Sequence, residues 1–196
     1  MKRSVNRLFY IAIPVLLILI IFFSYTFIRE KVLKGLVYPL KYTELVNQYA
    51  DENELDRSLV YAVIKCESSF KPDAKSGIGA RGLMQITPET FTWAQTKRYP
   101  NDKLPADELY KPETNIKFGT FILAMHLREF QNKEAAIAAY HAGRGKVNEW
   151  LKNKAYSDDG INLKTIPTTD TAQYVKRVIN TQKTYTNLYK EVFQNE

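Results

Sequence analysis

Hydrophobic and polar positions follow two different patterns along this chain. Residues 8–28, LFYIAIPVLLILIIFFSYTFI, form a continuous apolar run without a charged residue. From residue 43 onward, apolar residues recur at intervals of three and four, which is the period of an amphipathic helix. No segment shows a convincing alternation with the period of two that a half-buried strand requires. The pattern therefore predicts an all-α protein with one apolar helix near its N-terminus.

Seven helices are expected after the apolar run, and local signals set several of their ends. Asp56 and Thr87 are suited to N-cap positions, Pro88 to a first helical position, and Gly143 to a helix end. The expected helices cover residues 43–53, 56–68, 87–95, 112–130, 132–143, 145–153 and 169–189. The intervening loops at 76–86 and 155–167 leave room for a short hairpin.

We interpret the apolar run as an uncleaved transmembrane anchor. Its 21 residues span about 31 Å as a helix, which is close to the hydrocarbon thickness of a bilayer. A cleavable signal peptide is the alternative, but the run is long for one and no small-x-small cleavage site follows it. Gly35 and Pro39 are expected to interrupt the helix beyond it. The predicted layout is a cytoplasmic N-terminus (1–7), an anchor (8–28), a stalk (29–42), a helical domain (43–190) and a C-terminal tail (191–196).

The positive charge of the chain belongs mainly to the flanks of this anchor. The formal net charge is +7, and residues 1–34 hold six basic residues and one acidic residue, a net +5. The remainder carries only +2, so the domain is nearly balanced and no nucleic-acid partner is expected.

The cysteine and histidine content argues against metal and cofactor chemistry. Cys66 is the only cysteine, which excludes an internal disulfide and a cysteine-based zinc site. The two histidines are His126, which we expect at a core or boundary position of its helix, and His141. No phosphate-binding or dinucleotide-binding motif is present. We therefore expect no cofactor and no metal.

Glu67 is the residue whose position asks for an explanation. Leu59, Val63 and Glu67 are spaced four apart, so the helix that supplies core residues also directs this carboxylate inward, near its own C-terminus. Desolvation and the negative end of the helix dipole both raise the pKa of a carboxyl placed there. A carboxyl partly protonated near neutral pH is suited to general acid catalysis. An exposed glutamate at a frayed helix end is the alternative.

A glycine-containing loop follows the predicted helix end at Phe70–Pro72. Glycine tolerates positive φ and has no side chain to obstruct a ligand, and this loop contains Gly77, Gly79 and Gly82. The next residues combine apolar Leu83 and Met84 with the amide of Gln85, a mixture that suits a sugar with hydroxyls, acetamido groups and apolar ring faces. A plain turn between helices remains the alternative for any one of these residues.

Four ordered motifs resemble those of the soluble lytic transglycosylase family, whose domain has a goose-type-lysozyme-like helical fold and cleaves peptidoglycan glycan strands. ESSFKPDAKSGIGARGLMQITP, from Glu67, resembles the family signature. AAYHAG at 138–143 is similar to its Ala-Tyr-Asn-Ala-Gly motif, IP at 166–167 to the usual approach, and TAQYVKRV at 171–178 to its Tyr-Val motif. The resemblance runs from about Thr43 to Tyr189.

The resemblance implies a role for individual residues of this chain. It makes Glu67 the catalytic acid and base, and Tyr174 the tyrosine that hydrogen-bonds it. It assigns substrate contacts to the loop and cleft-wall residues Ser76, Met84, Gln85, Tyr140 and His141. Two positions depart from the family: His141 replaces the usual Asn and adds a titratable group, and Thr87 stands where many relatives have a second Met.

The resemblance also implies a reaction and a location. Glycoside hydrolysis normally uses two carboxylates, and Asp73, Glu89 and Asp170 are weak partners for Glu67: Asp73 is in a loop, Glu89 opens a helix and Asp170 is expected to cap one. A lytic transglycosylase needs one acid, because the substrate's own 6-hydroxyl closes a 1,6-anhydromuramic ring. A lysozyme-like hydrolase, a catalytically silent glycan-binding scaffold and, least favoured, a helical membrane-anchored adaptor without a glycan site remain alternatives. Since peptidoglycan lies outside the membrane, the domain is expected there, with the N-terminus inside.

Overall fold

The computed structural model describes residues 2–98, 100–101 and 103–193. The chain divides into two compact units, residues 1–40 and residues 41–196, which are considered separately. All regular elements in the described ranges are helical, and only isolated β-bridges occur between them. The predicted all-α class is confirmed for these residues.

The first unit consists of one long helix and a short π-helical turn. Helix α1 spans Lys2–Val32, and the turn η1 continues from Leu33 to Val37. The stretch Ala12–Val37 has a mean hydropathy of 2.2 and is long and apolar enough to cross a membrane. The expected interruption at Gly35 is wrong, because the helical backbone passes through it and ends before Pro39. A glycine costs a helix only about 1 kcal/mol, whereas a proline disfavours helical geometry in the residue before it.

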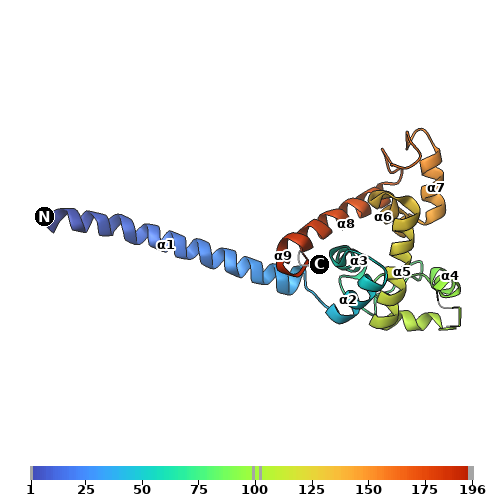
Figure 1. Cartoon of the computed structure of the whole chain (residues 1–196). Helices are drawn as coiled ribbons and strands as arrows, with labels where there is room; N and C mark the ends of the chain where they lie inside the picture. Colours follow the sequence, from blue (N-terminus) through green and yellow to red (C-terminus); the bar gives the residue numbers. More distant parts are fainter. Residues whose placement is uncertain (1, 99, 102, 194–196) are drawn as a thin grey trace. The chain divides into compact units, whose positions relative to one another are not determined.

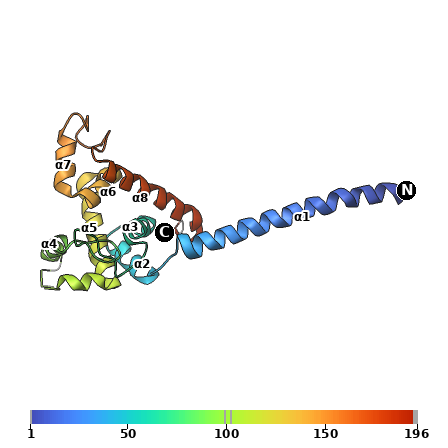
Figure 2. The ribbon, with the colours of Figure 1, turned by 180° about the vertical axis from the view of Figure 1, so that it is seen from behind.

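The described residues of the second unit form eight α-helices and one 3-10 turn. The α-helices are α2 (Thr43–Glu52), α3 (Arg57–Ser68), α4 (Pro88–Arg98), α5 (Pro112–Phe130), α6 (Lys133–Ala142), α7 (Arg144–Lys152), α8 (Thr169–Leu188) and α9 (Lys190–Phe193). Both views show α7 near one end of α6, away from α2 (Figures 1 and 2). The seven predicted helices are confirmed, with ends that differ by up to three residues.

Helix α3 lies at the centre of the core and packs mainly against α8, while α6 packs against α5 and α8. Residues 58–64 of α3 are all buried, so this helix is apolar around almost its whole circumference. Four buried alanines of α6, at 135, 136, 138 and 139, leave little side chain between this helix and its neighbours. The small residues therefore let α6 pack closely against α5 and α8.

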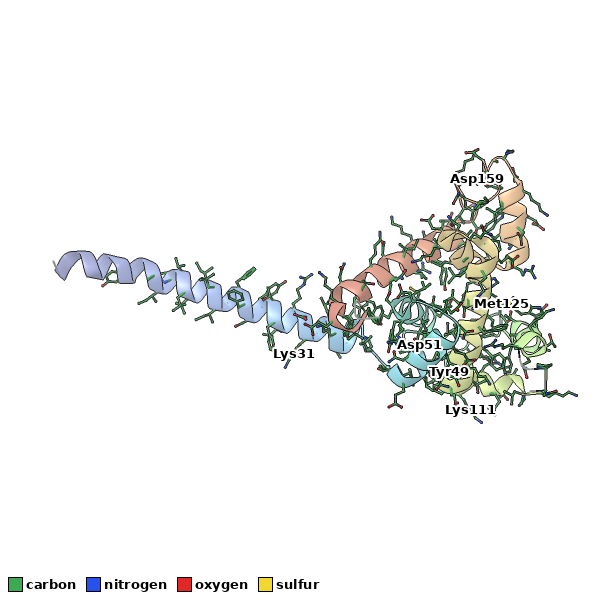
Figure 3. The ribbon with its side chains drawn as sticks, in the orientation of Figure 1. Lys31, Tyr49, Asp51, Lys111, Met125 and Asp159 are labelled. Atoms are coloured by element: carbon green, nitrogen blue, oxygen red, sulfur yellow. The ribbon has the colours of Figure 1, made fainter. Side chains whose placement is uncertain are left out.

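Some features of this unit were absent from the sequence prediction. The 3-10 turn η2, Ala106–Tyr110, lies between α4 and α5. The loop around residues 76–86, where the sequence leaves room for a short hairpin, forms no strands. It contains two isolated antiparallel bridges, Lys75 with Arg81 and Arg81 with Ile86. The loop after α7 is organised by Asp159 (Figure 3), whose carboxylate accepts hydrogen bonds from the backbone N–H groups of Ile161 and Asn162. The first residues of the predicted tail belong to α9, and residues 194–196 lie outside the described range.

Candidate active site

The last turn of α3 delivers Glu67 to the surface of the core. Asp56 caps the start of this helix by accepting a hydrogen bond from the backbone N–H of Ser58 at 2.8 Å. Leu59 and Val63 are buried on the face that Glu67 continues, and the C-cap residue after the helix, Ser69, has a φ of 50°. Glu67 is half-buried and lines a cleft of about 630 Å³. The predicted inward direction of its carboxylate is confirmed.

The surroundings of Glu67 favour a carboxyl that can both give and take a proton. Burial raises the pKa of Glu67 from 4.5 to about 7, and a hydrogen bond from Tyr174 and the positive charge of Arg177 oppose part of that rise. Tyr174 donates from its hydroxyl to Oε1 of Glu67 at 2.5 Å and is only 2% exposed. Both protonation states are therefore populated near neutral pH, with one oxygen fixed by a neutral donor.

Asn115 of α5 fixes the glycine loop above Glu67, and the sequence analysis missed this residue. Its side chain is fully buried, donates to the backbone oxygens of Arg81 and Leu109 at 2.9 and 2.8 Å, and accepts from the N–H of Met84 at 2.7 Å. Gly82 has a φ of +75°, and a Cβ there would lie 2.1 Å from the oxygen of Leu109. The close approach of the loop to Asn115 therefore requires glycine at position 82.

Two of the predicted loop residues, Ser76 and Gln85, line the cleft, whereas Met84 is buried in the core. The amide nitrogen of Gln85 donates to the backbone oxygens of Ala74 and Gly82, which orients its side chain from behind. The side chain of Met84 is fully buried and packs against Gly119 of α5. The structure thus corrects the expectation for Met84, whose apolar side chain fills the core, where it gains more burial than in an open cleft.

The C-terminal end of α6 forms the opposite wall with Tyr140 and His141. Tyr140 donates its hydroxyl to the backbone oxygen of Met84 at 2.8 Å, so this tyrosine ties the wall to the loop. The ring of His141 stacks on Tyr174 with 4.4 Å between centroids and 26° between planes. Its Nδ1 lies 3.3 Å from Oγ1 of Thr171, and its Nε2 lies 3.5 Å from Oδ2 of Asp170. His141 therefore packs directly on the tyrosine that holds Glu67.

Position Asp170 differs from its expected role as a helix cap. The N-cap of α8 is Thr168, and Asp170 is the second residue of the helix. Its carboxylate faces His141. Burial lowers the pKa of His141, while Asp170 raises it and Arg177 lowers it. The imidazole is consequently held neutral over more of the acidic range than a free histidine.

The cleft continues past Tyr140 to residues that the sequence analysis did not assign to a site. Thr87 and Glu89 line it near the start of α4, Trp93 lies further along that helix, and His126 and Arg144 come from α5 and α7. His126 is 7% exposed, as expected for a core or boundary histidine. Ile122, four residues earlier on α5, also lines the cleft. This spacing, which puts both residues on one face of the helix, was the sequence signal that could have placed His126 at the site. In the described ranges, no group of three His, Cys, Asp or Glu side chains is placed to hold a metal ion.

The helical domain places one half-buried glutamate, Glu67, at a cleft, which fits the predicted lysozyme-like class. Within it, residues 44–162 match the family described as the Transglycosylase SLT domain, more than half of the chain, and the chain belongs to this family. The family resemblance found in the motifs is thereby confirmed.

Curated relatives share the domain but are longer. The chain is 38% identical over 144 residues to the soluble lytic murein transglycosylase of Salmonella typhimurium, covering 72% of this chain and 22% of the relative. It is 30% identical over 174 residues to the membrane-bound lytic murein transglycosylase C of Edwardsiella ictaluri, covering 74% of this chain and 46% of the relative. The chain therefore spans between about a fifth and a half of these relatives.

Solved structures show the same fold. The 70 kDa soluble lytic transglycosylase of Escherichia coli superposes with a TM-score of 0.68 at 34% identity, covering 76% of this chain and 25% of that chain. An inactive glutamate-to-glutamine mutant of the lytic transglycosylase Slt from Pseudomonas aeruginosa gives the same TM-score at 32% identity, covering 76% and 24%.

Replacing Tyr174 with Phe is expected to move the pKa of Glu67 above its value of about 7, because the lost hydrogen bond favours the ionised carboxylate. A carboxyl-carbon NMR titration measures this pKa, with the Glu67→Gln spectrum identifying the resonance. The matched control is Tyr140→Phe, since that hydroxyl donates to a backbone oxygen and not to Glu67. An unchanged pKa in Tyr174→Phe would contradict the assigned hydrogen bond.

Proposed function

We propose that this chain is a membrane-anchored lytic transglycosylase. It cleaves the glycosidic bond between N-acetylmuramic acid and N-acetylglucosamine in peptidoglycan and leaves a 1,6-anhydromuramic end. The observation that carries the proposal is Glu67, a cleft carboxyl with a pKa of about 7 that a buried tyrosine holds in place. Membership of the SLT-domain family supports it, as does the inactivity of the glutamate-to-glutamine mutant of a relative with the same fold.

The first step is protonation of the glycosidic oxygen by Glu67. Near pH 7 the protonated carboxyl is well populated, and its second oxygen is fixed by Tyr174. As the bond breaks, positive charge develops at the anomeric carbon of the muramic residue, and the acetamido oxygen of that sugar stabilises it. Glu67, Ser76 and Gln85 line one cleft, so we assign the orientation of the acetamido group to Ser76 and Gln85.

In the second step the ionised Glu67 acts as a base. It removes the proton from the 6-hydroxyl of the same sugar, whose oxygen then attacks the anomeric carbon and closes the 1,6-anhydro ring. The Tyr174 hydrogen bond favours the ionised form that this step needs, while burial favours the protonated form that the first step needs. One residue can serve both steps because these opposing effects leave its pKa near the working pH.

Glu89 gives the hydrolase alternative a specific candidate, because it is a second carboxylate that lines the cleft. It is exposed in the first turn of α4, where its negative charge interacts favourably with the positive end of the helix dipole. The products decide between the two reactions. We expect the full chain in detergent to release muropeptides with anhydromuramic ends, lighter by one water than reducing ends, from purified peptidoglycan. Reducing ends would identify a hydrolase, and binding without turnover would identify a scaffold.

We further propose that the apolar helix anchors the domain at the outer face of the cytoplasmic membrane. The stretch Ala12–Val37 is apolar enough to span a bilayer, and one group of relatives carries the name membrane-bound. Three basic residues lie on each side of the apolar run, so the orientation is argued from the substrate: peptidoglycan lies outside the membrane, which requires a cytoplasmic N-terminus. A protease added to intact spheroplasts is expected to digest the domain in this orientation and to spare it in the reverse one.

The wild type is expected to lose activity on the acidic side of its pH profile, and the variant His141→Asn is expected to avoid this loss. Protonation of His141 puts a cation in the cleft that Glu67 also lines, and a cation there disfavours the positive charge of the oxocarbenium-like transition state. Because burial lowers the pKa of His141, the loss is expected below pH 6.5, with a factor of about 3 to 10 in kcat/KM. Measuring kcat/KM from pH 4 to 8 tests this. Identical acidic limbs in the two proteins would contradict it.

A further inference from the structure

His126 is a polar side chain that the proposed reaction leaves unused, at the end of the cleft beyond Tyr140. It is 93% buried, and its Nδ1 is sealed from solvent without a hydrogen-bond partner among the described residues. Burial lowers its pKa to about 4, so the ring is neutral near pH 7. A buried unpaired acceptor costs less than a buried unpaired donor with no acceptor nearby, which favours the proton on Nε2. Since Nδ1 is sealed, Nε2 is the polar atom left for the cleft that His126 lines.

The N-terminus of α7 lies near His126 at the cleft, since, besides burial, the charge of Arg144 contributes to lowering the pKa of this histidine. Gly143, Arg144 and Gly145 all line the cleft. Gly143 is the N-cap of this nine-residue helix, has a φ of 90°, and offers no side chain to cap the first turn. The first backbone N–H groups of a helix have no partner within the helix, and the helix dipole makes this end positive. The start of this helix therefore offers the cleft further hydrogen-bond donors and a partial positive charge, in addition to the Nε2–H of His126.

Arg144 places a full positive charge at the rim. Its side chain is 56% exposed, and one of its terminal nitrogens lies 3.2 Å from Oε1 of Glu129. Asn148 of α7 donates to the same oxygen at 3.1 Å. This carboxylate orients the guanidinium of Arg144 through one terminal nitrogen, and a guanidinium has further N–H groups to offer a ligand. The donors toward this end of the cleft are an imidazole N–H, helix N–H groups and a guanidinium; the carboxylate of Glu89, which also lines the cleft, is exposed to solvent, and water and salt weaken its repulsion of an anion.

We propose that this end of the cleft is a carboxylate-binding subsite that holds an acidic group of the peptide attached to the glycan strand. Hydrogen bonds from such donors are strongest to a carboxylate. In peptidoglycan the free carboxylates belong to the peptides, because the lactyl group of each substituted muramic residue is joined to its peptide by an amide. The inference rests on the proposed function and adds that the enzyme prefers strands with acidic peptides. A sugar hydroxyl or acetamido oxygen is the competing occupant.

The test compares two forms of one substrate: native glycan strands, and strands whose peptide carboxylates have been converted to amides with carbodiimide and ammonia. The full chain in detergent is expected to cleave the native strands with about a tenfold higher kcat/KM. His126→Leu and Arg144→Met are each expected to reduce this preference by about threefold or more, and His126→Gln, which restores a donor, to recover part of it. Lys152→Met, at the other end of α7, is the control for losing a positive charge and is expected to keep the preference.

The outcomes separate this inference from the proposed function. Equal cleavage of native and amidated strands by the wild type, with anhydro ends from both, would overturn the subsite and leave the reaction standing. A loss of rate in His126→Leu that is equal on both substrates would assign His126 to a sugar contact and would also overturn it. No cleavage of either substrate would refute the proposed function itself.

Discussion

Glu67→Gln is expected to lower the rate of anhydromuropeptide release by about 10³-fold or more. The glutamine is nearly isosteric but gives no proton to the glycosidic oxygen and takes none from the 6-hydroxyl, and general acid–base catalysis contributes about 10² to 10⁴ for a positioned group. The hydroxyl of Tyr174, which now donates to Oε1 of Glu67 at 2.5 Å, still finds an oxygen in the amide. Mass analysis of muropeptides released over time from purified peptidoglycan measures the rate.

Glu89→Gln is the matched control for this substitution. It removes the other carboxylate that lines the cleft, from an exposed position in the first turn of α4. A single-acid mechanism predicts that this variant retains anhydro products at a rate within a few-fold of the wild type. Activity retained in Glu67→Gln would remove Glu67 from its role, and a large loss in Glu89→Gln alone would favour a mechanism with two carboxylates.

The position of Glu67 was predictable because it rests on the regular geometry of one helix. The spacing of Leu59, Val63 and Glu67 places these residues on one face whatever surrounds the helix. Burial of the first two then brings the third to the edge of the core, where desolvation raises its pKa. The helix ends were predictable for a similar reason, since Asp56 acts through the backbone two residues away.

The loop residues were harder to place because a loop has no period. Met84 and Gln85 are neighbours, and nothing local shows which of them faces the cleft. Gln85 adopts a φ of 49°, and the buried Asn115 holds the backbone at Met84 and Arg81 from a helix about 30 residues later in the sequence. The direction of each side chain is therefore set by a tertiary contact that sequence spacing does not encode.

The far end of the cleft was missed for a related reason. His126 was correctly expected to be buried, but a buried histidine becomes part of a site only when another element leaves a cavity beside it. Here that element is α7, whose glycine-capped N-terminus lies at the same cleft. Neither helix carries a sequence signal for the other, so the juxtaposition appears only in the folded domain.

Glu67→Gln is also expected to change the free energy of unfolding by different amounts at different pH. The change is expected to be more stabilising at pH 8 than at pH 4 by about 3 kcal/mol. The pKa of Glu67 is about 7 in the folded protein against 4.5 for an ordinary glutamate. Between these values the folded state binds more protons than the unfolded state. The free energy of unfolding of the wild type therefore falls as pH rises from 4.5 to about 7, and the loss is complete above 7. Glutamine does not titrate and avoids this loss.

Urea unfolding at pH 4 and pH 8, followed by tryptophan fluorescence, measures the difference. Both tryptophans, Trp93 and Trp150, belong to the domain, so the signal reports its unfolding and not that of the apolar helix. Glu149→Gln, at an exposed position of α7, controls for the loss of a negative charge. A gain for Glu67→Gln that is the same at both pH values would show that burial does not raise the pKa of Glu67. A gain that grows with pH would show that the domain sacrifices stability to keep a protonated acid in its cleft at neutral pH.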